Sequence, residues 1–202
     1  MHATDSPLAL GAPQFSDSRL AGLAKAQGPL AAWEAAVSQN PKQAAAGVTG
    51  NFAVGLQLPD GRSFLAVDRF AICSLCYRVV GGRLHWAARA DDFSDTDCEI
   101  DPQAIFDYLY FHVIPSPRTI FKGIFRLPPG HYALMENGQL TVAPYWIPAF
   151  DEQSGVSFDA LKHEFRELLQ GSVAAQLDGS KPACFLSGGT DSSTVAGMAA
   201  QI

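Results

Sequence analysis

The chain lacks long apolar segments and clusters of basic residues. None of its 202 residues belongs to a run approaching about 18 consecutive apolar residues, so no transmembrane helix is expected. The net charge is −6 and lysine and arginine are scattered, which argues against nucleic acid or an anionic membrane as a partner. The first residues contain no basic region followed by an apolar run. A signal peptide is therefore not predicted, and the cytoplasm is the expected compartment.

Cysteine and charge are also scarce. Cys73 and Cys76 form one CxxC pair, but the second pair that a zinc site requires is missing, so all four cysteines are interpreted as reduced structural thiols. Charged residues make up 17% and hydrophobic residues 48%, a composition typical of a packed domain rather than a disordered chain.

The first three quarters of the sequence alternate between two kinds of periodicity. Residues 1–18 are polar and irregular and are interpreted as a loose terminus. Apolar spacing beyond them predicts helices over 18–27, 29–38 and 102–112, and strands over 51–58, 63–67, 75–80, 84–88, 131–135 and 139–142. The third helix places Ile105, Phe106, Leu109 and Tyr110 on one apolar face. We expect an α+β domain over residues 1–150.

A different pattern begins after residue 150. A Pro-, Gly- and acid-containing linker leads to a long amphipathic helix capped near Ser157. A short apolar strand is predicted over residues 183–186, and a helix of small residues begins at about Thr190. Helix, strand and helix in this order are typical of the opening of a parallel α/β domain, so we assign residues 151–202 to a second, incomplete domain.

The loop between this strand and helix has the composition of an anion site. Gly188 and Gly189 carry no side chains, so backbone N–H groups can approach a ligand closely. The helix that follows directs its free N–H groups and positive dipole end to the same place. Ser187, Ser192 and Ser193 add hydroxyl donors. The alternative is a Ser/Gly turn that merely caps a helix, but the ordered combination favours a phosphate site.

Asp191 adds a carboxylate to this phosphate site. A carboxylate repels phosphate unless a cation lies between them, and Mg²⁺ accepts oxygen ligands from both groups. The loop therefore predicts Mg²⁺-pyrophosphate binding, with Asp191 as the metal ligand. No Gly-Lys-Ser/Thr follows, so it is not a Walker A loop.

These motifs resemble those of the asparagine synthetase (glutamine-hydrolysing) family. The loop SGGTDSS is similar to the SGGxDS loop of ATP pyrophosphatases. Residues 114–123, 127–131 and 145–146 are similar to the family stretches I-P-x-P-x-T-I-x-K-G, L-P-P-G-H and Y-W. Residues 50–54 and 67–70 are similar to its G-x-F-A and R-D-x-x-G stretches. The likeness runs from about residue 46 to residue 202.

The resemblance implies two folds in succession. The first is an α+β N-terminal nucleophile hydrolase-like sandwich with αββα layers, here degenerate. The second is the first helix-strand-helix of a doubly wound α/β ATP-pyrophosphatase domain. It also implies that Leu186, Ser187, Gly188, Gly189, Asp191, Ser192 and Ser193 contact ATP, with Mg²⁺ on Asp191.

The glutaminase half of the family motif is incomplete. Family members use a cysteine directly after the initiator Met as nucleophile, whereas this chain has His2. The M-C-G-I-x-G strand and the glutamine-holding R-L-x-I and N-G-E-I-Y-N stretches are missing. Val67 precedes Asp68 where Arg is usual, and Ala71 replaces Gly. We therefore expect no glutamine hydrolysis and assign no catalytic residue in this segment.

The resemblance leaves several functions open. The first is ATP-dependent amide formation, in which a small-molecule or peptide carboxylate is activated and pyrophosphate released. The acceptor is ammonia, or a substrate amine as in β-lactam synthetases and lasso-peptide cyclases. The second is a non-catalytic scaffold with an inert loop, and the third is a true glutaminase whose start is missing. This segment alone is expected to be inactive, and a homodimer is a candidate assembly.

Overall fold

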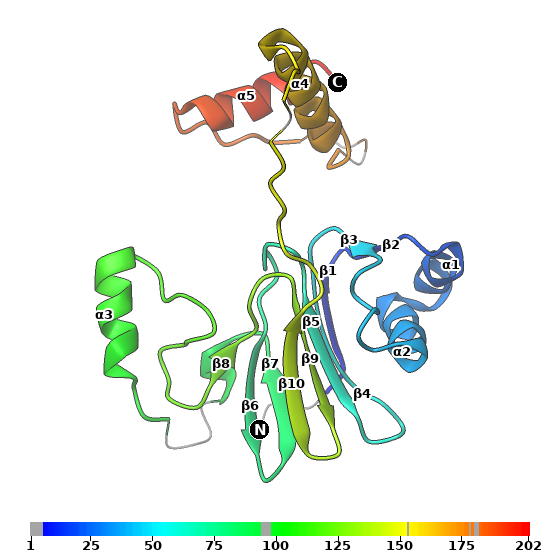
Figure 1. Cartoon of the computed structure of the whole chain (residues 1–202), viewed down its shortest axis with the longest axis vertical. Helices are drawn as coiled ribbons and strands as arrows, with labels where there is room; N and C mark the ends of the chain where they lie inside the picture. The colour runs from blue at the N-terminus through cyan, green and yellow to red at the C-terminus, as the bar shows by residue number, and fades with distance from the viewer. Residues whose placement is uncertain (1–5, 94–97, 153, 178, 180–181) are drawn as a thin grey trace. The chain divides into compact units, whose positions relative to one another are not determined.

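The chain forms two compact units. The computed structural model describes residues 6–93, 98–152, 154–177, 179 and 182–202 (Figure 1). The first unit is Met1–Pro148 and the second is Ala149–Ile202. Within the described ranges no helix is long and apolar enough to cross a membrane.

A five-stranded antiparallel sheet is the centre of the first unit. Its strand order is β1-β4-β5-β9-β10. The strands are β1 Leu8–Gly11, β4 Phe52–Gln57, β5 Ser63–Val67, β9 His131–Glu136 and β10 Gln139–Pro144. Asn137 and Gly138, at φ 53° and 75°, form the tight turn between β9 and β10, as this residue pair predicts.

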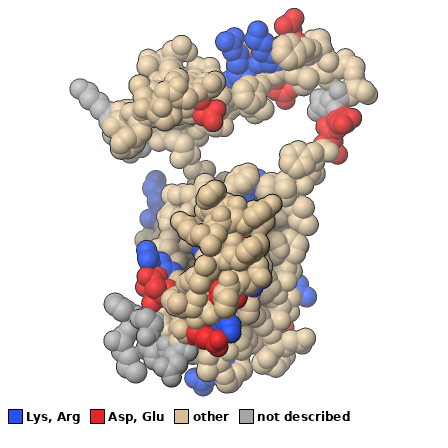
Figure 2. Space-filling model, turned by 90° about the vertical axis from the view of Figure 1, so that its left-hand side faces the viewer, with Lys and Arg blue, Asp and Glu red and all other residues tan. Residues whose placement is uncertain are grey.

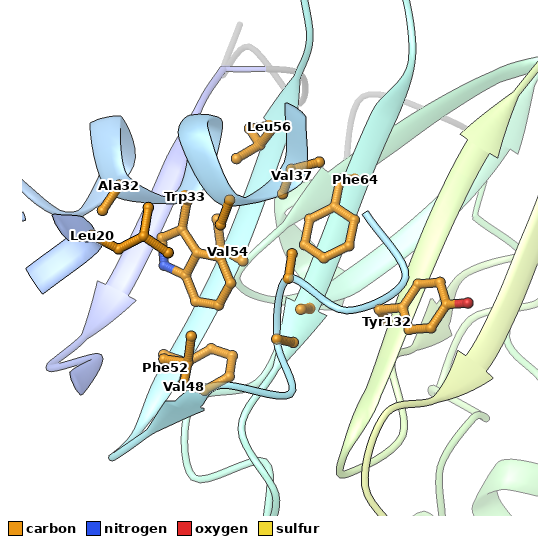
Figure 3. Packing of buried hydrophobic residues seen from close by; sticks show 14 of the residues in the cluster. Leu20, Ala32, Trp33, Val37, Val48, Phe52, Val54, Leu56, Phe64 and Tyr132 are labelled. Atoms are coloured by element: carbon orange, nitrogen blue, oxygen red, sulfur yellow. The ribbon is translucent and has the colours of Figure 1, made fainter. Parts of the chain in front are cut away.

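Two helices cover one face of this sheet. Helix α1 spans Ser18–Gln27 and α2 spans Pro29–Gln39, which confirms both predicted helices. Asp17 caps α1, and Gly28 at φ 92° turns the chain into Pro29. Trp33 of α2 is fully buried among apolar side chains of the sheet (Figure 3). Large members of this cluster are Leu20, Val37, Val48, Phe52, Val54, Leu56, Phe64 and Tyr132.

A second sheet covers the opposite face. It has the order β7-β6-β8, with β6 Cys76–Val80, β7 Arg83–Ala87 and β8 Phe125–Arg126. Side chains of β4 and β5 alternate between the two faces, so Val54 packs toward the helices whereas Ala53 packs toward the second sheet. Trp86 lies over Gly55, where an added Cβ would be 2.4 Å from the indole. The packing of the two sheets at this point therefore depends on a glycine.

The outermost helix does not complete the expected αββα layering. Helix α3, Pro102–Phe111, has Ala104 as its buried residue, and the predicted apolar face is exposed. The outer side of the second sheet is instead packed by the 3₁₀ turn Ala90–Phe93 and by Ile124. The described residues thus form a mixed α/β fold with three ordered layers rather than four.

The loose N-terminus predicted for residues 1–18 is wrong for the described part. Strand β1 pairs with β4, and β2 Gln14–Phe15 pairs with β3 Val48–Thr49. Gly11 makes the first pairing possible, because an added Cβ would lie 2.2 Å from the Asn51 carbonyl oxygen. These strands have little periodicity of their own and form because another strand pairs with each of them, β4 with β1 and β3 with β2.

The second unit contains two helices. Helix α4, Phe158–Ala174, is capped by Ser157 as predicted, and the Ala160 N–H donates to the Ser157 Oγ. Helix α5 spans Thr190–Ala199. The strand predicted over residues 183–186 is not formed. Phe185 is 97% exposed, because an apolar strand needs a neighbouring strand for its backbone hydrogen bonds and this unit has no such neighbour in its described residues.

Candidate functional site

The predicted phosphate loop leads directly into α5. Gly188 has φ 80°, a left-handed conformation natural only to glycine, and nothing lies within 4 Å of the position of an added Cβ. Gly189 is the N-cap of α5 and supplies no side-chain hydrogen bond. The first N–H groups of a helix have no partner within it, so those of residues 190–192 are available to an anion.

Serine hydroxyls hold this loop in a closed turn. The Ser187 and Ser192 Oγ atoms lie 2.9 Å apart, and the Ser187 N–H donates to the Ser192 Oγ at 3.2 Å. The Gly189 N–H donates to the Ser187 Oγ at 3.3 Å. Ser193 is exposed on the first turn of the helix. The loop is therefore ordered by its own hydroxyls before any ligand contact.

Asp191 lies in the first turn of α5 with an exposed side chain. A carboxylate near a helix N-terminus is favourable by itself, and here it stands beside hydroxyl groups. Oxygen donors of this kind suit Mg²⁺. The loop residues therefore fit a metal-bound phosphate, although Leu186, at 66% exposure, is not held by a strand.

A second polar feature lies in the first unit, at the end of β5. The Asp68 side chain is buried and its carboxylate accepts four backbone N–H groups. The donors are Phe52 at 3.1 Å, Phe70 at 3.0 Å, Ile72 at 3.1 Å and Cys73 at 3.0 Å. We call residues 68–73 the Asp68 turn. The carboxylate is satisfied by backbone and has a structural role here.

The Asp68 turn also holds the chain where it leaves the first unit. The Gly130 N–H donates to the Asp68 carbonyl, and the Tyr145 and Trp146 N–H groups donate to the Gly130 carbonyl. The Tyr145 hydroxyl donates to the Val67 carbonyl at 2.7 Å. Burial, with the Asp68 charge, raises the pKa of Tyr145, so this hydroxyl remains a donor at neutral pH.

Family comparisons identify both units. The family model of the glutamine amidotransferase domain matches residues 34–146, more than half of the chain. This chain belongs to the glutamine amidotransferase domain family. The asparagine synthase family model matches residues 164–202. The predicted resemblance to asparagine synthetases is thereby confirmed, and the two parts are called the amidotransferase unit and the synthase segment below.

Curated relatives agree with this assignment. Asparagine synthetase (glutamine-hydrolysing) 1 of Bacillus subtilis is 28% identical over 138 residues, covering 66% of this chain and 22% of the relative. Asparagine synthetase (glutamine-hydrolysing) 3 of the same organism is 38% identical over 142 residues, covering 68% and 23%. Amidase chyE of Penicillium rubens is 36% identical over 148 residues, covering 68% and 21%. The chain spans about a fifth of the length of the curated relatives it matches.

A solved structure was also matched. The glutamine phosphoribosylpyrophosphate amidotransferase of Bacillus subtilis, complexed with ADP and GMP, aligns at 10% identity with a TM-score of 0.40. The alignment covers all of this chain and 46% of the other chain.

Burial changes the pKa of two thiols of the amidotransferase unit. Burial, with the nearby Asp68 carboxylate, raises the pKa of Cys73, and burial raises the pKa of Cys76. Both groups are therefore thiols at neutral pH, whereas the nucleophile is a thiolate. His2 lies outside the described residues.

Two family departures have a structural explanation. Val67 is fully buried between the two sheets, where an Arg side chain would need a partner for its charge. Ala71, at the position that is Gly in the family pattern, has φ 50°. This left-handed backbone is sterically less favourable for alanine than for glycine. The left-handed backbone at position 71 is therefore compatible with the glycine of the family pattern.

We expect Asp68→Asn to lower the free energy of unfolding by about 3–5 kcal/mol, because an amide replaces one acceptor oxygen by a donor facing buried N–H groups. Urea unfolding followed by circular dichroism would measure this. Asp151→Asn, at an exposed carboxylate, should change stability by less than about 0.5 kcal/mol. Equal effects of the two variants would contradict the role given to Asp68.

Ala71→Gly is expected to stabilise the amidotransferase unit by about 0.5–1 kcal/mol, because glycine adopts the left-handed backbone without steric cost. Urea unfolding followed by circular dichroism would measure this gain in the free energy of unfolding. Ala66→Gly, in the buried strand β5, is the opposite control. It should lower the free energy of unfolding, because glycine in a strand loses more conformational freedom on folding. A loss of stability in Ala71→Gly would show that the Ala71 methyl packing outweighs the backbone strain.

Alkylation at neutral pH should modify the cysteines in a fixed order. Cys184 is exposed and should react first, and Cys76 is buried with a raised pKa and should react last. Iodoacetamide labelling with peptide mass spectrometry measures the rates. If Cys73 reacted faster than Cys184, it would be an activated thiol and a glutaminase nucleophile would have to be reconsidered.

Proposed function

We propose that the protein to which this chain belongs forms amide bonds with ATP. A carboxylate substrate, either a small molecule or a peptide, is activated with release of pyrophosphate, and ammonia or an amine then attacks the activated acyl group. The observation that carries the proposal is the SGGTDSS loop at the N-terminus of α5, with its exposed Asp191, inside the segment that matches asparagine synthase. We propose the cytoplasm as the compartment of this activity.

The loop residues have distinct roles in this proposal. Backbone N–H groups of Gly188, Gly189 and the first turn of α5 bind the pyrophosphate oxygens, and the hydroxyls of Ser187, Ser192 and Ser193 donate to them. Asp191 holds Mg²⁺, which neutralises charge on the phosphates when bound. The backbone at Leu186 contacts adenine or ribose. The strand that would present Leu186 belongs to a doubly wound ATP-pyrophosphatase domain, of which this chain contributes the opening.

The amidotransferase unit is proposed to be a degenerate N-terminal nucleophile hydrolase-like sandwich without glutaminase activity. The raised pKa values of the Cys73 and Cys76 thiols, and Val67 at the position where the family pattern has Arg, support this. Without ammonia from glutamine, a substrate amine becomes the favoured acceptor, as in β-lactam synthetases and lasso-peptide cyclases. The similarity to amidase chyE, a relative not named for asparagine, is compatible with a different amide product.

Asp191→Asn should weaken magnesium-dependent binding of pyrophosphate by at least about tenfold, because one metal ligand loses its charge. Isothermal titration calorimetry of this chain with pyrophosphate, with and without Mg²⁺, measures the change. Asp159→Asn is the matched control, since Asp159 is an exposed carboxylate in the first turn of α4, and it should bind like the parent chain. Binding that is absent, or indifferent to Mg²⁺ and to Asp191, would favour the scaffold alternative.

A further inference from the structure

A cavity lies between the two sheets of the amidotransferase unit, at one end of the strands. Its volume is about 320 Å³, within the range of about 300–1,000 Å³ that small-molecule sites occupy. The turns β4–β5, β6–β7 and β9–β10 surround it, and Figure 1 draws these turns together at the lower end of the unit. We call this cavity the end pocket, and the residues that line it include Gln57, Ser63, Arg83, Trp86, Met135 and Asn137.

Polar residues replace the apolar core where the strands reach the end pocket. Side chains alternate along a strand, so Gln57 of β4 faces the same side as Ala53, which packs in the core between the two sheets. Ser63 of β5 likewise faces the same side as Leu65 of that core. Gln57 and Ser63 are partners in the β4–β5 register, so their side chains stand next to each other. The space between the sheets therefore ends in polar groups.

Ser63 is buried and lacks a hydrogen-bond partner for its hydroxyl. The residue is 6% exposed, and its Oγ makes no hydrogen bond with any residue that the structure describes. A buried hydroxyl without a partner is unfavourable, because it loses the hydrogen bonds that it makes with water. Ser63 lines the end pocket and faces the space between the sheets, so a molecule bound there supplies the partner.

Arg83 gives the end pocket its charge. Among the described residues that line the cavity only Arg83 is charged, its side chain is exposed, and no ion pair joins it to the described part of the chain. The acids closest in sequence have another partner, since the Arg62 guanidinium lies 2.7 Å from the Asp60 Oδ2 and 3.9 Å from the Glu136 Oε1. A guanidinium presents parallel N–H donors that match the two oxygens of a carboxylate. The end pocket therefore favours a carboxylate over an amine.

Charges outside the end pocket do not select a polyanion. Figure 2 shows acidic and basic residues side by side on the face of the unit that it presents. The whole chain has a net charge of −6. A nucleic acid or another polyanion needs an extended basic surface. A single guanidinium at a cavity of this size instead suits one carboxylate on a small molecule.

The inner wall of the end pocket is apolar. Leu84 and Trp86 of β7 and Met135 of β9 line it, and each is at most 5% exposed. The Trp86 Nε1 donates to the Ser6 carbonyl at 3.1 Å, which fixes the indole. An apolar wall combined with a few polar groups is typical of small-molecule sites. This wall suits an uncharged tail attached to the carboxylate.

We propose that the end pocket binds a small organic carboxylate. The carboxylate bridges the two sheets, because Arg83 of β7 donates from one sheet and the Ser63 hydroxyl of β5 donates from the other. The exposed side-chain amides of Gln57 and Asn137 add donors, and the uncharged tail lies against Trp86. The site shares no residue with the phosphate loop and requires neither ATP nor Mg²⁺, so it stands or falls separately from the proposed function.

Pentanoate titrated into the 202-residue chain, without ATP or Mg²⁺, tests the site. Two-dimensional ¹H–¹⁵N NMR should show saturable shifts at the backbone amides of Gln57, Ser63 and Asn137, with a Kd on the order of 1 mM for so small a ligand. Pentanamide has the same tail without the charge and should bind at least about tenfold more weakly. Failure of pentanoate to shift these amides, or equal affinity of the acid and the amide, would overturn the proposal.

Charge variants separate the pocket from general attraction of an anion. Arg83→Gln should weaken pentanoate binding by about tenfold and leave the binding of pentanamide unchanged, because only the pairing with the carboxylate is lost. Arg19→Gln, at an exposed arginine of α1, is the matched control and should bind pentanoate like the parent chain. Equal losses in the two variants, or tighter binding of inorganic phosphate than of pentanoate, would reduce the site to an adventitious anion contact and overturn the proposal.

Ser63→Ala distinguishes a ligand contact from a structural role. The variant should weaken pentanoate binding by about fivefold, because one hydrogen bond to the carboxylate is lost. The urea midpoint of unfolding should stay the same or rise, since the hydroxyl has no partner to lose among the described residues. A lower midpoint together with unchanged pentanoate binding would make Ser63 a residue of the core alone and contradict the proposal.

Discussion

The amidotransferase unit depends on one buried carboxylate with no charged partner among its hydrogen bonds. Asp68 accepts from backbone N–H groups at the start of β4 and along the Asp68 turn, so a single side chain fixes the relative position of these two chain segments. A buried charge is tolerated only when its acceptor positions are filled. Through Gly130, the same residue also determines where Tyr145 and the following linker leave the sheet.

This arrangement accounts for the loss of family residues without loss of the fold. The backbone amides supply the hydrogen bonds, so the identity of most side chains in the Asp68 turn can change. Ala71 retains the left-handed backbone of the glycine it replaces, and Val67 contributes to the core where the motif has a charge. The backbone of the Asp68 turn can therefore persist while its side chains change.

Local signals in the sequence were sufficient for most helices and hairpins. Gly28 followed by Pro29, Asn137 followed by Gly138, and the Ser157 cap all occur where the structure changes direction, because each imposes a backbone conformation or fills a hydrogen bond locally. Strand β1 was not predicted, since its existence depends on pairing with β4. Residues 183–186 were predicted as a strand from apolar composition alone, which cannot supply a neighbouring strand.

For the candidate sites too, features formed by residues adjacent in sequence are predictable, whereas features formed by distant segments are not. The phosphate loop is predicted from residue order, because glycines, hydroxyls and a helix start are adjacent in sequence. The environment of Asp68 is not predictable in this way, since one of its four donors, the Phe52 N–H, comes from the start of β4, far from Asp68 in the sequence. Periodicity located α3 and its apolar side, but only the position of Arg118 against Asp101 and Asp107 decides that this side faces outward.

The contact between Gly55 and Trp86 has a consequence for the wider family. The indole occupies the space that any Cβ at position 55 would need, and its Nε1 donates to the Ser6 carbonyl at 3.1 Å. A larger residue at 55 is compatible with the same sheet separation only if the residue at 86 becomes smaller. These two positions should therefore covary across homologues, with a bulky ring at one accompanied by the smallest residue at the other.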